Sequence, residues 1–142
     1  MGDMITLDEN IKCPAATAFD PMADARNELR WNSGVSKVEL TSGEPIGKGT
    51  RFRVADKRGQ HDAAITAYER PGILSFAVND PKMDVLINIE FSERDNITTM
   101  TSRFNAKGKG MMKFLLPLLV PLIRRDISKE HKKFVKLCEA IN

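Results

Sequence analysis

The chain contains only two histidines, and histidine is the side chain that most often moves protons near neutral pH. His61 follows the turn signal Arg58-Gly59, so it could point into the mouth of a cavity and act as an acid or base. His131 lies in the charged stretch 129–133 and is expected on the solvated face of a helix. The sequence contains no GxSxG, HExxH, P-loop or GxGxxG motif. These residues define no catalytic pair, and enzymatic activity is left open.

The two cysteines, Cys13 and Cys138, lie near opposite ends of the chain, outside any CxxC motif or histidine cluster. We therefore expect no zinc site, no other metal and no cofactor. A disulfide is possible, but reduced thiols in a cytoplasmic protein are favoured. The first ten residues contain acids and lack the apolar segment of a secretion signal, which supports the same location.

An apolar run, FLLPLLVPLI, occupies residues 114–123. Ten residues span about 15 Å as a helix, half of a bilayer core, so the run is not a transmembrane helix. Nearly every position from Met111 to Ile123 is apolar, which is more than one buried stripe requires. This excess favours the wall of an apolar pocket. Pro117 and Pro121 should bend the helix and make this part movable.

The charge is unevenly distributed. The chain has 22 Lys and Arg against 19 Asp and Glu, a net charge of +3. Residues 107–142 alone hold nine basic and three acidic residues. A basic helix beside an apolar run could contact an anionic membrane, although a solvated outer helix face is the simpler interpretation. Nucleic acid is not an expected partner, because aromatic residues do not alternate with the basic ones. A homodimer remains possible.

The length of 142 residues and a hydrophobic content of 42% predict one domain, residues 1–142, with a substantial core. A first strand is expected from Met4 to Ile11. Two short helices, broken near Pro21, should follow within residues 14–31. Period-two alternation and turn signals then predict six further strands, in residues 35–41, 49–55, 60–70, 73–78, 83–92 and 97–104. A helical stripe in residues 107–142 completes an α+β fold, a curved seven-stranded antiparallel sheet whose concave face is covered by a long C-terminal helix.

Four phrases of the sequence strengthen this prediction: I-x-C-P-A-A-T-A-F-D (11–20), A-D-A-R-N-E-L-R-W-N (23–32), G-E-P-I-G-K-G-T-R-F-R (43–53) and I-T-A-Y-E-R-P-G-I-L-S-F (65–76). With the order of elements, they resemble the SRPBCC superfamily, also called START-like or helix-grip. More narrowly, the chain resembles the polyketide cyclase/dehydrase and lipid-transport group. The resemblance covers nearly the whole chain and is specific for the fold, which many different chemistries share.

The resemblance implies an apolar cavity between the sheet and the C-terminal helix, for a lipid, quinone, polyketide or sterol-like molecule. The expected ligand-binding residues are Trp31, Phe76, Met83, Val85, Ile87, Phe91, Phe104, Met111, Met112, Leu115, Leu118, Leu119 and Leu122. A cyclase or dehydratase in the same cavity is the alternative, with His61, Tyr68 and Trp31 as its candidate residues. Further polar candidates are Arg53, Glu69, Asn88 and Arg103, of which the two arginines and Asn88 are expected to face water. A peripheral membrane or quinone-site partner is the third hypothesis.

Overall fold

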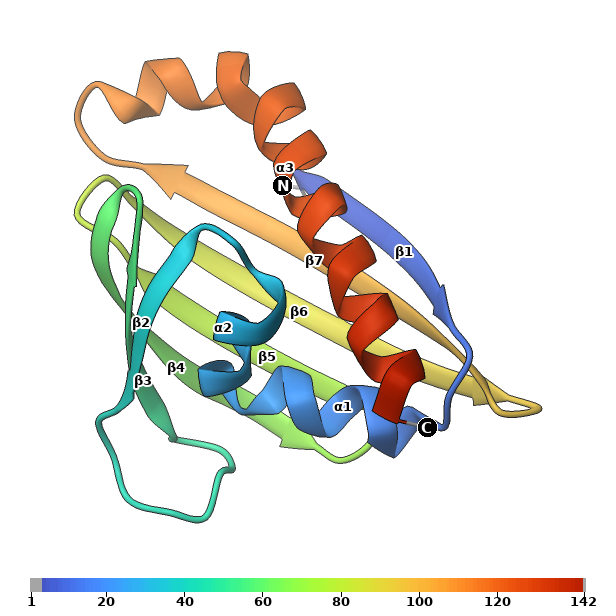
Figure 1. Ribbon diagram of the computed structural model, residues 1–142. Coiled ribbons are helices and arrows are strands. Elements are labelled where there is room, and N and C mark those ends of the chain that lie inside the picture. Colours follow the sequence, from blue (N-terminus) through green and yellow to red (C-terminus); the bar gives the residue numbers. More distant parts are fainter. Residues whose placement is uncertain (1–3, 142) are drawn as a thin grey trace.

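The computed structural model describes residues 4–141 and confirms the α+β helix-grip prediction (Figure 1). One antiparallel sheet has the strand order β1-β7-β6-β5-β4-β3-β2. The strands are β1 (Ile5–Ile11), β2 (Val35–Leu40), β3 (Arg51–Asp56), β4 (Gly59–Glu69), β5 (Ile73–Asn79), β6 (Met83–Arg94) and β7 (Ile97–Gly108). The helices are α1 (Ala15–Ala23), the 3-10 turn η1 (Ala25–Asn27), α2 (Glu28–Trp31) and α3 (Met112–Ile141). All of them lie on one face of the sheet, called here the inner face (Figure 1).

The alternation read from the sequence places the strands correctly. In β6, Met83, Ile89 and Phe91 are buried, whereas Asp84 and Glu90 are exposed. Successive strand residues point to opposite faces, so the buried set faces the helices and the polar set faces solvent. The continuous register of β6 with β5 and β7 extends the same two faces across the centre of the sheet.

A bulge in β4 reverses this alternation. The register of β4 against β5 shifts between Ile65 and Ala67, after which Tyr68 lies opposite the buried Leu74. A simple count would place Tyr68 on the outer face, but the extra residue turns its ring inward. The ring packs edge-on against Phe19 of α1, with centroids 5.1 Å apart.

The first helical segment differs from its prediction, because Pro21 does not break it. Helix α1 continues through Pro21 to Ala23. The interruption comes at Asp24, whose carboxylate accepts a hydrogen bond from the backbone N–H of Arg26 at 3.1 Å. A side chain that caps the next turn offers the backbone an alternative to continuing the helix, so the break follows the aspartate.

The long helix α3 has two parts, and Figure 1 shows that they run in different directions. Both Pro117 and Pro121 lie inside the helix, where a missing N–H and ring crowding bend it. The second part carries the buried side chains His131, Phe134 and Cys138 and packs on β1, β7 and the short helices. Within residues 4–141, no helix combines the length and hydropathy of a membrane span.

Candidate ligand-binding site

An apolar patch on the inner face of the sheet is not fully covered. Ile87 of β6 lies opposite Phe104 of β7, and Val85 lies opposite Val78 of β5. All four side chains are partly exposed, whereas Ile89, two residues beyond Ile87, is only 3% exposed. The other expected lining residues of the sheet, Phe76, Met83 and Phe91, face the same way and are buried. The uncovered patch therefore lies among residues that the sequence assigned to the inner face.

The first part of α3 carries two apolar stripes instead of one. The inner stripe consists of Met112, Leu116, Leu119 and Ile123, of which Leu116 is buried and the others are partly exposed. The outer stripe consists of Phe114, Leu115, Leu118 and Leu122, with exposures of 78%, 43%, 77% and 48%. Residues three, four and seven apart share a helix face, so the two stripes point in different directions.

The outer stripe corrects part of the sequence prediction. Met111, Leu115, Leu118 and Leu122 were expected to face the sheet, but each is exposed, Met111 by 78%. The period of the helix was obscured because nearly every position of this segment is apolar. Met112 and Leu119 lie on the inner stripe, and Leu116, which the sequence did not single out, is the most buried residue of this part.

His131 is buried, so its expected position on a solvated face is wrong. It is 4% exposed, and its ring lies 6.2 Å from that of Trp31 and 6.1 Å from that of Phe104, measured between centroids. Burial lowers the pKa of His131 to about 4, and the neighbouring carboxylate of Glu9 opposes this shift only in part. The imidazole is therefore neutral at pH 7.

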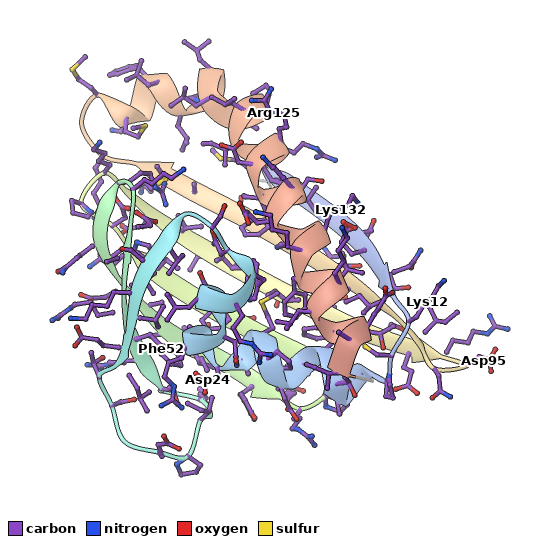
Figure 2. The ribbon with its side chains drawn as sticks, viewed as in Figure 1. Lys12, Asp24, Phe52, Asp95, Arg125 and Lys132 are labelled. Carbon is purple, nitrogen blue, oxygen red and sulfur yellow. The ribbon has the colours of Figure 1, made fainter. Side chains whose placement is uncertain are left out.

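Glu9 of β1 is the sheet residue whose charge acts on this ring. It belongs to the inward set of β1, lies opposite Met100 and is 8% exposed. The ammonium of Lys132 binds both of its carboxylate oxygens, at 2.7 and 3.1 Å. Figure 2 shows Lys132 on the second part of α3, beside β1, whereas Arg125 lies nearer the bend. The buried carboxylate is thus compensated from the rim of the helix.

Three buried polar atoms at the His131 end of the site lack hydrogen-bond partners within the described chain. Trp31 Nε1, His131 Nδ1 and Ser102 Oγ have no hydrogen-bond partner among the described residues, 4–141. Trp31 is 8% exposed and Ser102 fully buried. Trp31 also packs edge-on against Phe134, with ring centroids 5.3 Å apart, so α3 holds this tryptophan in place.

The two catalytic candidates of the sequence lie far apart. His61 and Tyr68 are seven positions apart on β4, a separation of about 20 Å at the usual rise of a strand. His61 Nδ1 is 3.6 Å from Asp56 Oδ2, and burial lowers its pKa. The charge of the same Asp56 also acts on Glu28 of α2. Protein atoms surround the carboxyl group of Glu28, although other atoms of the residue are partly exposed, and this desolvation raises the pKa of Glu28 to about 7. One small reacting centre cannot contact both His61 and Tyr68.

The remaining polar candidates face outward, as expected for the arginines and Asn88. Arg53 Nε donates to Asp62 at 3.2 Å, and Arg103 pairs with Glu90 at 3.1 Å. Asn88 shares a 2.6 Å hydrogen bond with the hydroxyl of Ser75. Glu69 is exposed. These contacts belong to the outer surface of the sheet.

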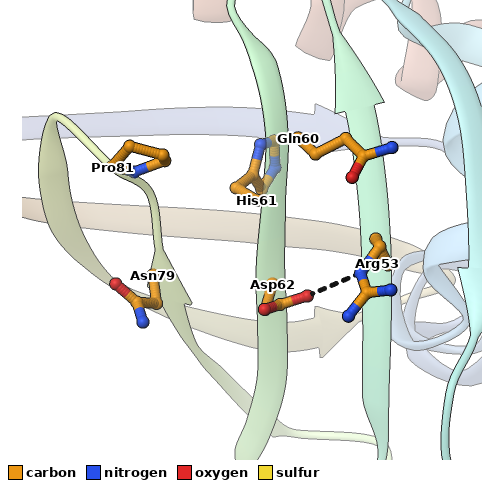
Figure 3. Close-up of a pocket in the computed structure, with 6 residues that line it drawn as sticks. All are labelled: Arg53, Gln60, His61, Asp62, Asn79 and Pro81. Atoms are coloured by element: carbon orange, nitrogen blue, oxygen red, sulfur yellow. Dashed lines mark hydrogen bonds and ion pairs between the residues drawn. The ribbon is translucent and has the colours of Figure 1, made fainter.

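Two pockets include some of these outward residues. One, of about 350 Å³, is lined by Arg53, Gln60, His61, Asp62, Asn79 and Pro81 (Figure 3). The other, of about 300 Å³, is lined by Thr66, Ser75, Phe76, Leu86, Ile87, Asn88, Arg103 and Asn105. Neither is the predicted cavity between sheet and α3. In the described part of the chain, no group of three or more His, Cys, Asp or Glu residues could hold a metal ion.

A sheet whose inner face holds a long C-terminal helix, with short helices beside an apolar patch, defines a helix-grip protein of the SRPBCC superfamily. The chain belongs to the family described as polyketide cyclase / dehydrase and lipid transport, whose model matches residues 4–139. A search of curated proteins found no match.

Solved structures share the fold at low sequence identity. A conserved protein from Geobacillus kaustophilus has a TM-score of 0.74 and 17% identity, over 94% of this chain and 93% of that one. A protein from Thermus thermophilus has a TM-score of 0.77 and 12% identity, over 97% and 98%. The di-domain ARO/CYC BexL from the BE-7585A biosynthetic pathway has a TM-score of 0.70 and 15% identity, over 96% of this chain and 49% of that one. At these identities the likeness shows the fold alone.

Proposed function

We propose that the protein binds a hydrophobic small molecule between the inner face of the sheet and the inner stripe of α3. The uncovered apolar patch of Val78, Val85, Ile87 and Phe104 carries this proposal. Contiguous apolar patches left open on a folded protein often mark binding sites, because covering them is favourable by about 25 cal/mol per Å². The family description, which includes lipid transport, supports the same function.

Two adjacent leucines give a matched test. Leu119 lies on the inner stripe and is partly exposed, whereas Leu118 lies on the outer stripe and is 77% exposed. We expect Leu119→Asp to weaken binding of the apolar dye Nile red by tenfold or more, because a carboxylate would have to be desolvated at the ligand. Leu118→Asp should change it less than about twofold. Circular dichroism verifies that both variants fold.

Two results would contradict binding at the inner stripe. The first is unchanged dye affinity in folded Leu119→Asp protein. The second is a loss of affinity confined to Leu118→Asp, which would show that the dye adheres to the outer stripe. Mass spectrometry of an organic extract of the purified native protein, against a heat-precipitated control, would identify the chemical class of a bound molecule.

The outer stripe supports a second function, contact with an anionic membrane. Residues 107–125 contain five Lys or Arg and no Asp or Glu, and all five are exposed. One of them, Lys109, forms an ion pair with Asp84 at 3.1 Å. A helix with exposed leucines and flanking cations is typical of an element that lies in a membrane interface. The lipid surface would then be where the ligand enters or leaves.

Co-sedimentation with vesicles tests this second function. The protein should bind vesicles that contain phosphatidylserine more strongly than pure phosphatidylcholine, and Leu118→Asp should bind less than Leu119→Asp. If the outer stripe joins two copies instead, light scattering will show a dimer that Leu118→Asp dissociates, and the vesicles will retain neither protein. That outcome would replace the membrane by a homodimer.

The other hypotheses from the sequence stay predictions. These are a cyclase or dehydratase reaction, a quinone-site partner and a cytoplasmic location. The geometry supports binding better than a reaction, because the separation of His61 and Tyr68 prevents them from acting together.

A further inference from the structure

We propose that Trp31, His131 and Ser102 form a polar end of the ligand site, which binds the carbonyl or hydroxyl oxygen of an otherwise apolar, uncharged ligand. This inference rests on the proposed function above and specifies the ligand for the same site. The three residues come from α2, α3 and β7, so the site exists only in the folded chain.

Trp31 and His131 lie side by side, and the strand register places Ser102 near them. The ring of His131 lies 6.2 Å from that of Trp31 and 6.1 Å from that of Phe104. Ser102 precedes Phe104 by two residues on β7 and therefore points to the same inner face. It pairs with Leu7 of β1.

The position of Glu9 helps to locate His131 relative to the strands. Glu9 lies two residues along β1 from Leu7, on the same face, and its charge acts on His131. The imidazole contacts Phe104 and interacts electrostatically with Glu9. In the paired inner rows of β7 and β1, Ser102 lies between these two residues, so we place the imidazole over Ser102.

Burying these polar atoms without partners is costly. Each unsatisfied buried polar group has lost its hydrogen bonds to water without replacement, and such groups in folded proteins are almost always satisfied. The indole N–H of Trp31 can only donate, the hydroxyl of Ser102 donates or accepts, and a neutral imidazole nitrogen does one or the other. An oxygen atom with two lone pairs meets these requirements.

The apolar part of the ligand has a continuous path to this polar end. Phe104 contacts His131 and is itself partly exposed, and its cross-strand partner Ile87 is partly exposed too. A molecule that covers this patch thus brings one end to His131, so a polar group at that end would reach the buried atoms.

The charges around the site favour an uncharged ligand over an anion. His131 is neutral at pH 7, because its pKa is lowered to about 4. The adjacent charged groups are Glu9 from β1 and Lys132 from α3, and the lysine already binds the glutamate. A fatty-acid carboxylate would therefore approach the buried carboxylate of Glu9, and the ammonium that could compensate it is already bound to that glutamate.

Three naphthalene derivatives of matched size test the proposal. They are 2-ethylnaphthalene, 2-acetylnaphthalene and 2-naphthoate, which present a hydrocarbon, a neutral carbonyl and an anion. Calorimetry should show that the ketone binds about fivefold or more tighter than the hydrocarbon, as one or two neutral hydrogen bonds provide. The carboxylate should bind no better than the hydrocarbon. Trp31 is the only tryptophan, so its single indole N–H signal in a ¹H–¹⁵N spectrum should move downfield with the ketone alone.

Conservative variants separate the polar end from the apolar wall. Trp31→Phe, His131→Phe and Ser102→Ala remove one polar atom each and keep most of the packing. Each should reduce the ratio of ketone affinity to hydrocarbon affinity, which is the quantity to compare between the variant and the unmodified protein. Equal binding of ketone and hydrocarbon, with an unmoved indole signal, would overturn the polar end but not the proposed function. Failure of all three compounds to bind would overturn both.

Discussion

Replacing His131 by phenylalanine should make the stability of the protein less sensitive to acid. The imidazole has an ordinary pKa of 6.5 in the unfolded chain and a pKa of about 4 in the folded one, because it is buried against Trp31 and Phe104. Between these values the unfolded state binds the extra proton, so stability falls as the pH falls from 6.5 towards 4. His131→Phe removes this titration and preserves an aromatic ring between the two neighbours.

The size of the effect follows from the two pKa values. A difference of 2.5 units corresponds to about 3 kcal/mol when titration is complete, and to about 2 kcal/mol between pH 8 and pH 5. Urea unfolding followed by circular dichroism, at several pH values in this window, gives the free energy of unfolding for both proteins. Their difference should change by about 2 kcal/mol in favour of the variant at pH 5. Contributions that the two proteins share, such as that of Glu28, cancel in this difference.

His61→Phe is the matched control, because His61 is the other histidine and its pKa is also lowered by burial. The side chain of His61 is 12% exposed and lies 3.6 Å from Asp56, so its effect should have the same sign and a smaller size. A pH profile of His131→Phe parallel to that of the unmodified protein would refute the reasoning. It would mean that the folded protein accommodates a charged imidazole beside Glu9.

Three further predictions concern the core and its buried ionisable groups. Phe134→Ala should lower the free energy of unfolding in urea by about 3–5 kcal/mol, because Phe134 is fully buried. Ile141→Ala, at a position 51% exposed, should lower it by less than about 0.5 kcal/mol. Equal effects of the two substitutions would contradict the packing of α3. Cys13 and Cys138 are buried free thiols, and burial raises the pKa of both, that of Cys138 to about 12. Iodoacetamide at pH 8 should therefore label them slowly until urea unfolds the protein. Labelling that is equally fast without urea would disprove their burial. Glu28→Gln should reduce the loss of stability that occurs as the pH rises from 5 to 8. The folded state has a raised pKa of about 7 at Glu28, so it binds this proton more tightly than the unfolded state and is destabilised when the proton leaves. A pH profile of stability unchanged by the substitution would contradict that shift.

The sequence predicted the fold well where its pattern was periodic. The alternation of Met83, Ile89 and Phe91 with polar residues located β6 and its inner face, because a strand with one buried face must alternate. Tyr68 could not be placed in this way, because the bulge between Ile65 and Ala67 leaves no mark in composition.

The candidate site was predicted less completely. His131 was assigned to a solvated face because lysines and a glutamate surround it in sequence, yet it lies four residues after Ile127 and three before Phe134. That spacing, which continues to Cys138, is the helical stripe of the core, and it would have identified the buried histidine. The outer stripe of α3 was hidden for the opposite reason, since a segment that is apolar all round has no periodic signal.

The position of β1 has a consequence for how the chain acquires its structure. Strands β2 to β7 follow one another as hairpins, but β1 pairs with the last strand, with Ile5 opposite Phe104. During synthesis, the meander can therefore assemble while β1 still has no partner. The inner face cannot be closed before α3, which follows all seven strands in the sequence, has left the ribosome. The apolar surface that we propose for ligand binding in the folded protein is thus the surface that stays exposed longest during synthesis. It is also the surface most prone to aggregate before folding is complete.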